Sequence, residues 1–199
     1  MQITTAIIPD THLINALQQG NQVAFKQLVD SQQERVINTA LGFLPNMHDA
    51  EDICQEVFIE VYRSIHKFRG DAKISTWIYR VTVTKCLDHL KAKKRKKRIG
   101  YIQSLFGKDE QPIEIKDDFN HPGVTLENKE RTKVLFGAID QLPDNQRVAY
   151  TLNKIEGMPY KEVAEVLNVS LSSVESLLFR AKKNLKKHLY TYYQKEMIS

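Results

Sequence analysis

The chain has little of what membrane spans, secreted scaffolds and metal sites require. Its only two cysteines, Cys54 and Cys86, are far apart and form no C-x-x-C pair, which argues against a disulfide framework or a cysteine-rich zinc site. No apolar run approaches the roughly 18 residues of a membrane-spanning helix, and residues 1–10 lack the basic and apolar regions of a secretory signal. We therefore expect a protein of the reducing cytoplasm and not a membrane protein.

Motifs of catalysis and cofactor binding are also lacking. The six histidines form no H-E-x-x-H or comparable ligand spacing, and there is neither a glycine-rich phosphate loop nor a G-x-S-x-G elbow. Asp49, Glu51 and Asp52 lie close together, but acids at the start of a helix usually serve only to favour it. The sequence predicts a protein that is not an enzyme, with no catalytic residue, metal, cofactor or small-molecule substrate.

Positive charge is concentrated in one short block. The net charge of the 199 residues is +5, yet residues 91–100 alone hold seven Lys or Arg residues and no acid. Residues 101–130, which follow, are net acidic. A basic block of this kind indicates contact with a polyanion, nucleic acid first of all. From the run alone, a solvated helix end or a disordered basic tail is the alternative.

What the sequence does contain is a succession of helical patterns. Over 49–66, apolar residues recur three and four positions apart, which is typical of an amphipathic helix with one buried face. Similar patterns predict helices over 10–20 and 21–41, and a long helix from Ser75, its N-cap, into the basic block. We find no internal repeat and no convincing period-two strand, so the predicted fold class is all-α.

A break in these patterns divides the chain into two parts. Residues 99–125 hold three glycines, two prolines and an Asp117-Asp118 pair, which indicates an acidic, flexible linker. Helical patterns resume near Leu126. The predicted organisation is therefore two small helical domains, 1–98 and 126–199, joined by the linker 99–125.

The most specific pattern is a helix-turn-helix between Pro159 and Ala181. Ala164 is small enough for a second helix to cross closely, Asn168 tolerates a left-handed turn, and Ser170 can cap the second helix. This combination predicts DNA binding, with a plain helical hairpin as the alternative. The exposed face of the second helix would carry Ser172, Ser173, Glu175, Ser176, Phe179 and Arg180.

Several segments, in the right order, resemble the extracytoplasmic function (ECF) subfamily of bacterial sigma-70 factors. They include D-A-E-D-I-C-Q-E-V-F at 49–58, F-R-G-D-A-K-I-S-T-W-I-Y-R-V at 68–81, L-P-D-N-Q-R at 142–147 and G-M-P-Y-K-E-V-A-E-V-L-N-V-S at 157–170. The resemblance covers nearly the whole chain. It implies a sigma factor that binds core RNA polymerase and directs promoter-specific transcription initiation, with an anti-sigma factor as a plausible inhibitor.

The resemblance also implies roles for individual residues. The 1–98 domain, similar to sigma region 2, would dock on core polymerase through Asp49, Asp52, Ile53, Gln55, Glu56 and Phe58. The same domain would read the opened −10 element through Phe68, Arg69, Lys73, Ser75, Thr76, Trp77, Arg80, Thr84, Asp88, Lys91, Lys94 and Arg95. The 126–199 domain, similar to region 4, would read the −35 element through Arg147, Lys161, Ser172, Ser173, Glu175, Ser176, Phe179, Arg180 and Lys183.

Two alternatives stay open at this point. Trp77 could stack on a flipped base, or it could be an ordinary core residue at helical spacing. The whole chain could instead be a helix-turn-helix regulator that binds duplex DNA as a dimer without core polymerase.

Overall fold

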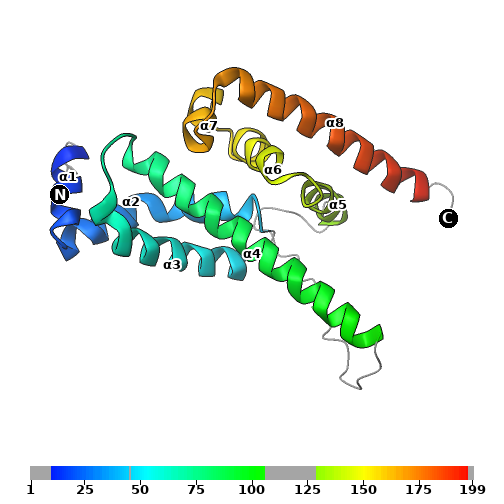
Figure 1. Cartoon of the computed structure of the whole chain (residues 1–199), viewed down its shortest axis with the longest axis horizontal. Helices are drawn as coiled ribbons and strands as arrows, with labels where there is room; N and C mark the ends of the chain where they lie inside the picture. The colour runs from blue at the N-terminus through cyan, green and yellow to red at the C-terminus, as the bar shows by residue number, and fades with distance from the viewer. Residues whose placement is uncertain (1–9, 45, 106–128, 197–199) are drawn as a thin grey trace, which may run out of the picture.

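The computed structural model describes residues 10–44, 46–105 and 129–196. In these ranges the chain forms helices and connecting turns without a strand, which confirms the predicted all-α fold (Figure 1). The elements in order are α1 (Asp10–Gln18), α2 (Gln22–Leu41), α3 (Met47–Ser64), η1 (Ile65–Lys67), α4 (Ile74–Leu105), α5 (Lys129–Ile139), α6 (Asp144–Tyr150), η3 (Thr151–Ile155), α7 (Tyr160–Leu167) and α8 (Leu171–Glu196).

The first domain is built from α1 to α4. α2, α3 and α4 pack against one another, and the apolar stripe of α3 is buried among them, as its helical spacing predicts. The predicted start of α2 is confirmed, because the Asn21 side chain accepts hydrogen bonds from the N–H groups of Val23 and Ala24 at 2.9 and 3.0 Å. Gln18 fastens α1 to the loop before α4 by donating to the Phe68 carbonyl at 2.9 Å.

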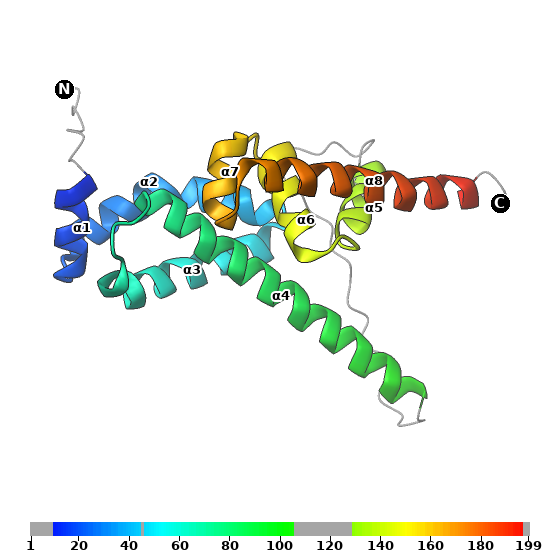
Figure 2. The same cartoon turned by 45° about the horizontal axis from the view of Figure 1, so that its top comes forward.

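The long helix α4 differs from its predicted limits at both ends. The expected N-cap, Ser75, lies inside the helix, because the carbonyl of Lys73 accepts the Trp77 N–H at 3.2 Å and the buried Ile74 holds the first turn on the core. At the other end α4 continues to Leu105, into the predicted linker. Residues 106–128, with the rest of that linker and Leu126, lie outside the described ranges. The second half of α4 projects beyond the other helices (Figures 1 and 2).

The second domain contains the predicted helix-turn-helix. Asn168 ends α7 in the left-handed conformation with φ 54°, and the Ser170 hydroxyl accepts the Ser173 N–H at 3.2 Å, which caps α8. Val163 and Val174 are fully buried at the crossing. Beyond the crossing, α8 packs on α5 and α6, so one long helix holds the whole domain together.

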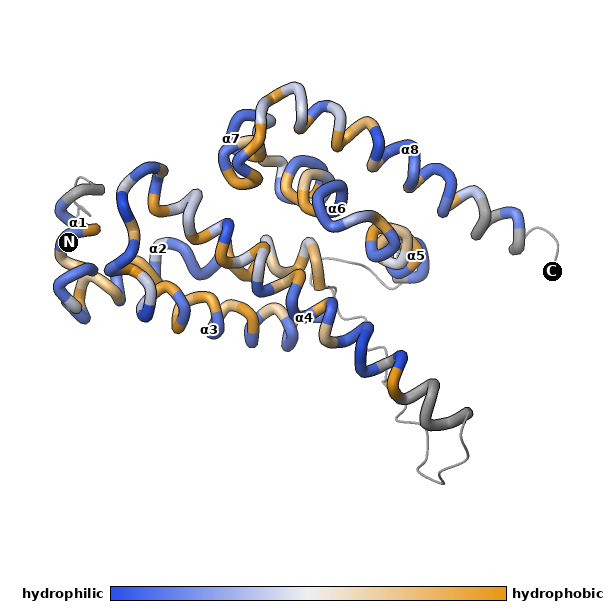
Figure 3. Tube along the Cα trace, viewed as in Figure 1, coloured by the Kyte–Doolittle hydropathy of each residue, from blue (hydrophilic) through white to orange (hydrophobic). Residues whose placement is uncertain are grey.

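The two domains are in direct contact, which corrects the expectation of two separate modules on a loose tether. α7 packs on α4 (Figure 2), and a single apolar cluster includes Ile78 of α4, Leu152 of η3 and Val163 of α7. Figure 3 shows hydrophobic positions on the packed helices, while the projecting half of α4 is mainly hydrophilic. A helical pattern reveals that a face is buried, but it does not reveal which domain covers that face.

Candidate nucleic-acid and partner interfaces

The outward face of α8 is exposed along the helix-turn-helix. Ser172, Glu175, Ser176 and Arg180 are exposed, and Phe179 is 71% exposed. Arg180 lies along the helix, since its Nε donates to the Ser176 carbonyl at 3.3 Å. An unburied helix face with hydroxyl and guanidinium groups at this position of the motif can enter a DNA major groove.

Ser170, Ser172 and Ser173 form a hydroxyl cluster at the start of α8. Ser170 Oγ lies 3.0 Å from Ser172 Oγ and 2.8 Å from Ser173 Oγ. Because Ser170 also caps the helix, the cluster orients the two following serines at the end of α8 that carries the positive dipole. This end of the helix is therefore suited to an anionic group such as a phosphate.

Arg147 is not the phosphate anchor that the sequence predicts. Its side chain is 3% exposed and donates to the carbonyls of Ile139, Asp140 and Leu142, at 3.2 and 3.4 Å for the first and last of them. It also pairs with the Asp140 carboxylate at 3.3 Å. Arg147 therefore holds the turn between α5 and α6 together. Lys161, the other predicted anchor, is exposed on α7.

The residues predicted to read the −10 element are divided between surface and core. Phe68 and Trp77 are half-buried and contact each other, with ring centroids 5.2 Å apart and planes inclined by 38°. Both pack against the apolar core, so Trp77 has a structural role at least. Thr76 is a correction, because it is 7% exposed and faces the interior. Arg69, Lys73, Thr84 and Asp88 are exposed, and Ser75 is half-buried.

Three cationic side chains of α4 that were predicted to contact DNA form hydrogen bonds or ion pairs with the second domain. Arg80 donates to the carbonyls of Glu165 and Val166 in α7, at 2.6 and 3.2 Å. Lys91 pairs with Asp144 at 3.2 Å, and Lys94 donates to the Asp140 carbonyl at 2.8 Å. Further along, Arg95, Lys96 and Arg98 are exposed on the projecting half of α4.

The predicted polymerase-docking residues of α3 also separate into two sets. Asp52, Gln55 and Glu56 are exposed, whereas Ile53 and Phe58 are 1% and 6% exposed. The prediction of a partner contact is therefore corrected for Ile53 and Phe58, which belong to the core of the first domain.

The acidic residues of α3 form ion pairs with neighbouring side chains. Asp49 is half-buried and lies 3.8 Å from His89 and 3.7 Å from Lys93, both on α4. Asp52 pairs with His48 at 3.2 Å, and Glu56 lies 3.8 Å from Lys85. Asp49 is thus turned toward α4, which leaves Asp52, Gln55 and Glu56 as the outward polar row.

Sequence reasoning missed an apolar hollow beside this row. Ile59 and Tyr62 are 50% and 51% exposed, and Tyr62 meets Phe25 edge to face with centroids 5.0 Å apart. The hollow is lined by Gln22, Phe25, Gln55, Phe58, Ile59, Tyr62 and Arg63. The signal was present in the sequence, because Ile59 and Tyr62 fall outside the buried stripe of their amphipathic helix.

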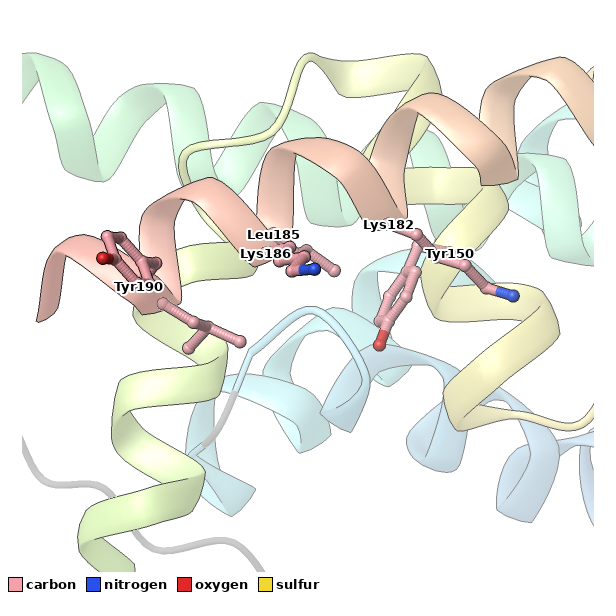
Figure 4. A pocket seen from close by; sticks show the side chains of 6 residues that line it. Tyr150, Lys182, Leu185, Lys186 and Tyr190 are labelled. Atoms are coloured by element: carbon pink, nitrogen blue, oxygen red, sulfur yellow. The ribbon is translucent and has the colours of Figure 1, made fainter. Parts of the chain in front are cut away.

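A second hollow lies on the second domain, along α8 (Figure 4). It is lined by Tyr150, Lys182, Leu185, Lys186, Leu189 and Tyr190. Burial raises the pKa of the Tyr150 phenol. The tail 190–199 matches no motif, and the sequence leaves open whether it extends the last helix or contacts a partner. In the structure α8 continues to Glu196.

The two cysteines are the remaining candidate nucleophiles among the described residues. Burial raises the pKa of the Cys86 thiol, and burial together with Glu51 raises that of Cys54, so both thiols are poor nucleophiles. Within the described residues, no three His, Cys, Asp or Glu side chains gather as metal ligands. No helix in those ranges is long and apolar enough to span a bilayer.

Known proteins are similar to this chain over most of its length. The family models for Sigma-70 region 2 and Sigma-70 region 4 match residues 28–96 and 134–185. The ECF RNA polymerase sigma-E factor of Escherichia coli K12 is 29% identical over 176 residues, covering 88% of this chain and 92% of that protein. The RNA polymerase sigma-H factor of Pseudomonas aeruginosa is 29% identical over 180 residues, covering 90% and 93%.

Solved structures share the fold. CnrH in complex with the cytosolic domain of CnrY superposes with a TM-score of 0.60 at 22% identity, over 92% of this chain and 97% of that one. The sigma factor RpoE of Bartonella quintana, in complex with the anti-sigma factor NepR, gives 0.54 at 17% identity, over 83% and 96%. Together with the two family matches in order along the chain, these findings disfavour a regulator that acts without polymerase. The chain belongs to the ECF subfamily of the sigma-70 family, whose members are transcription initiation factors and not enzymes.

Proposed function

We propose that this chain joins core RNA polymerase through the outward polar row of α3 and presents two separate DNA-reading surfaces. The start and basic half of α4 would contact the opened −10 element, and the outward face of α8 would enter the major groove of the −35 element. The single observation that carries the proposal is the capped α8, whose outward face stays exposed while its other face is buried.

The proposal is tested by reconstituting transcription from purified components. Purified chain is incubated with core RNA polymerase, and the holoenzyme is supplied with a library of promoter fragments whose transcripts are sequenced. We expect co-purification with core and transcripts that share common −10 and −35 elements. A chain that neither binds core nor redirects its initiation would contradict the proposal.

The α8 face makes a prediction about −35 reading. Arg180→Ala should lower the affinity of holoenzyme for duplex promoter DNA by about 10-fold to 100-fold, because one guanidinium contact to a base edge contributes about 1–3 kcal/mol. Arg131→Ala removes another exposed arginine, from α5, and should leave the affinity unchanged. The affinities are measured by fluorescence anisotropy. Wild-type affinity of the Arg180→Ala variant would mean that the outward face of α8 does not contact the −35 element through Arg180.

The projecting half of α4 makes a prediction about salt. Replacing Arg95, Lys96 and Arg98 together with Gln should flatten the dependence of log affinity on log salt by about 0.7–0.9 per lost phosphate contact. These three side chains are exposed, so folding should be unaffected. The control is the same triple change at the exposed Lys26, Arg131 and Lys154. Equal slopes for both triple variants would mean that the basic block does not track phosphates.

Inhibition by a protein partner is the second part of the proposal. Two structures of this fold were solved with a bound protein partner, the cytosolic domain of CnrY in one case and the anti-sigma factor NepR in the other. We infer that an anti-sigma factor also holds this chain inactive by covering one of the surfaces above. Such a partner should compete with core polymerase in the reconstitution described here.

A further inference from the structure

We propose that Glu175 selects a cytosine in the −35 element by accepting a hydrogen bond from the cytosine N4 amino group in the major groove. This inference rests on the proposed function of α8 and deepens it, since it names the base that one residue of the outward face recognises. The position of Glu175 on the helix, the charges around it and the structural roles open to an acid at this point support the inference.

Glu175 lies at one edge of the outward face of α8. Its side chain is exposed on the second turn of the helix, directly after the fully buried Val174. Ser172 and Phe179, three positions before it and four after it, are its exposed neighbours on the helix surface. At about 100° per residue, Arg180 falls about 140° around the helix from Glu175. The two side chains therefore lie at opposite edges of the outward face, where they can meet different base pairs.

Glu175 is an acid on an otherwise basic stretch of helix. Residues 171–190 hold five Lys or Arg residues and this single acid. DNA phosphates repel a carboxylate, so Glu175 lowers the sequence-independent part of the affinity. A base edge is a different target, because the cytosine N4 amino group is a donor that a carboxylate accepts. The other donor in the major groove, adenine N6, stands beside the N7 acceptor of the same base, which repels a carboxylate. Cytosine is therefore the base that suits Glu175 best.

The usual structural roles of an acid on a helix do not account for Glu175. The positions three and four residues to either side of it hold only leucine, serine and phenylalanine, so α8 offers it no ion pair across one turn. The helix dipole acts mainly on the first turn, which Glu175 follows. The capping-box position, three residues after the Ser170 cap, is occupied by Ser173. Since its side chain is exposed, Glu175 has no packing role either.

Three substitutions separate recognition of a base from the effect of charge. Glu175→Gln keeps the shape, and the glutamine amide can accept from adenine N6 while it donates to adenine N7. Glu175→Ala removes the acceptor and the repulsion of phosphates together. Glu165→Ala is the matched control, because it removes an exposed acid from α7 in the same helix-turn-helix. All three side chains replaced are exposed, so each variant should fold as the wild type does, which thermal unfolding checks.

The base preference is measured with holoenzyme reconstituted from the full chain or a variant. Promoter fragments with a randomised −35 element are bound, recovered and sequenced. We expect the wild type to prefer cytosine at one position by about tenfold over the other bases. Glu175→Gln should shift the preference at that position to adenine, and Glu175→Ala should abolish it there while the other positions stay as they are. Glu165→Ala should keep the wild-type preference.

A modified base tests the hydrogen bond itself. In the selected promoter, the cytosine is replaced by 2-pyrimidinone, which lacks only the 4-amino group. The wild-type holoenzyme should bind this fragment about tenfold more weakly than the cytosine fragment. Glu175→Ala has no acceptor to lose, so it should bind the two fragments equally. The comparison within one variant cancels any effect of the modified base on the duplex.

Two results would overturn the inference alone. The first is a Glu175→Ala holoenzyme that keeps the wild-type preference at every −35 position, whether or not it gains affinity for all sequences as Glu165→Ala does. The second is a wild-type holoenzyme that binds the 2-pyrimidinone fragment as tightly as the cytosine fragment. Both results leave the −35 element recognised by the rest of α8. A wild-type holoenzyme that selects no −35 sequence at all would instead contradict the proposed function, and the inference with it.

Discussion

Arg147→Ala should lower the free energy of unfolding by about 3 kcal/mol, because it breaks a buried and hydrogen-bonded charge. The guanidinium is 3% exposed and satisfies three carbonyls at the end of α5 and in the following turn. Alanine removes one donor from each of these carbonyls and leaves the Asp140 carboxylate with the exposed Lys94 as its remaining partner. We place the value at the low end of the range for buried pairs, since the Asp140 side chain is 42% exposed. The melting temperature should fall by about 10 °C.

Lys161→Ala tests whether Lys161 contacts DNA, whereas Arg147→Ala tests whether Arg147 stabilises the fold. Lys161 is exposed, so its loss should leave the urea midpoint unchanged while the affinity for duplex promoter DNA falls. Arg147→Ala should lower the urea midpoint. At temperatures where the variant is folded, its holoenzyme should bind DNA almost as tightly as the wild type does. An Arg147→Ala chain of normal stability with impaired DNA binding would restore the phosphate anchor and refute the structural role.

Reversing charge on the outward row of α3 should have the largest effect on activity. In the double variant Asp52→Lys and Glu56→Lys, both side chains are exposed one helical turn apart, so two repulsive charges would face any basic partner. Like charges brought together at an interface cost several kcal/mol, and we expect core polymerase affinity to fall by about 100-fold. Promoter-directed transcription should fall with it, as measured by titrating core against each variant in a run-off assay.

The matched control uses another pair of acids with the same spacing. Asp30 and Glu34 are exposed on α2, also four positions apart, and their reversal changes the net charge equally. If affinity depended on overall charge alone, the two double variants would behave alike. The docking assignment survives only if the α3 variant loses core binding and the α2 variant keeps it, with similar melting temperatures for both.

Local pattern was sufficient for the existence of the helices and for the helix-turn-helix, although not for the limits of α4. The apolar spacing of 49–66, the cap at Asn21 and the left-handed turn at Asn168 all depend on neighbours a few residues away, and such interactions can be read directly from the chain. The exposed face of α8 followed for the same reason, because a helix with one apolar stripe leaves its opposite face outward.

The errors concern partners that are distant in sequence. In the sequence, Arg147 cannot be distinguished from a surface arginine, because the turn between α5 and α6 that buries it forms only on folding. Ile53, Phe58 and Thr76 are buried by residues distant in sequence, so the sequence alone does not show whether they lie at an interface or in the interior. Long-range packing depends on shape complementarity across the whole molecule, to which composition and spacing give no access.

The residues of this chain are enough to specify its helices, its DNA-binding motif and its family, since each is encoded in short stretches by periodicity, capping and turn chemistry. The meeting of the two domains could not be foreseen in that way. It depends on Gly42, which has an ordinary φ but leaves space for the Thr151 side chain. It also depends on two carbonyls of α7 that accept hydrogen bonds from Arg80. Backbone carbonyls and empty space carry no signature in a sequence, so only the folded molecule reveals what they contact.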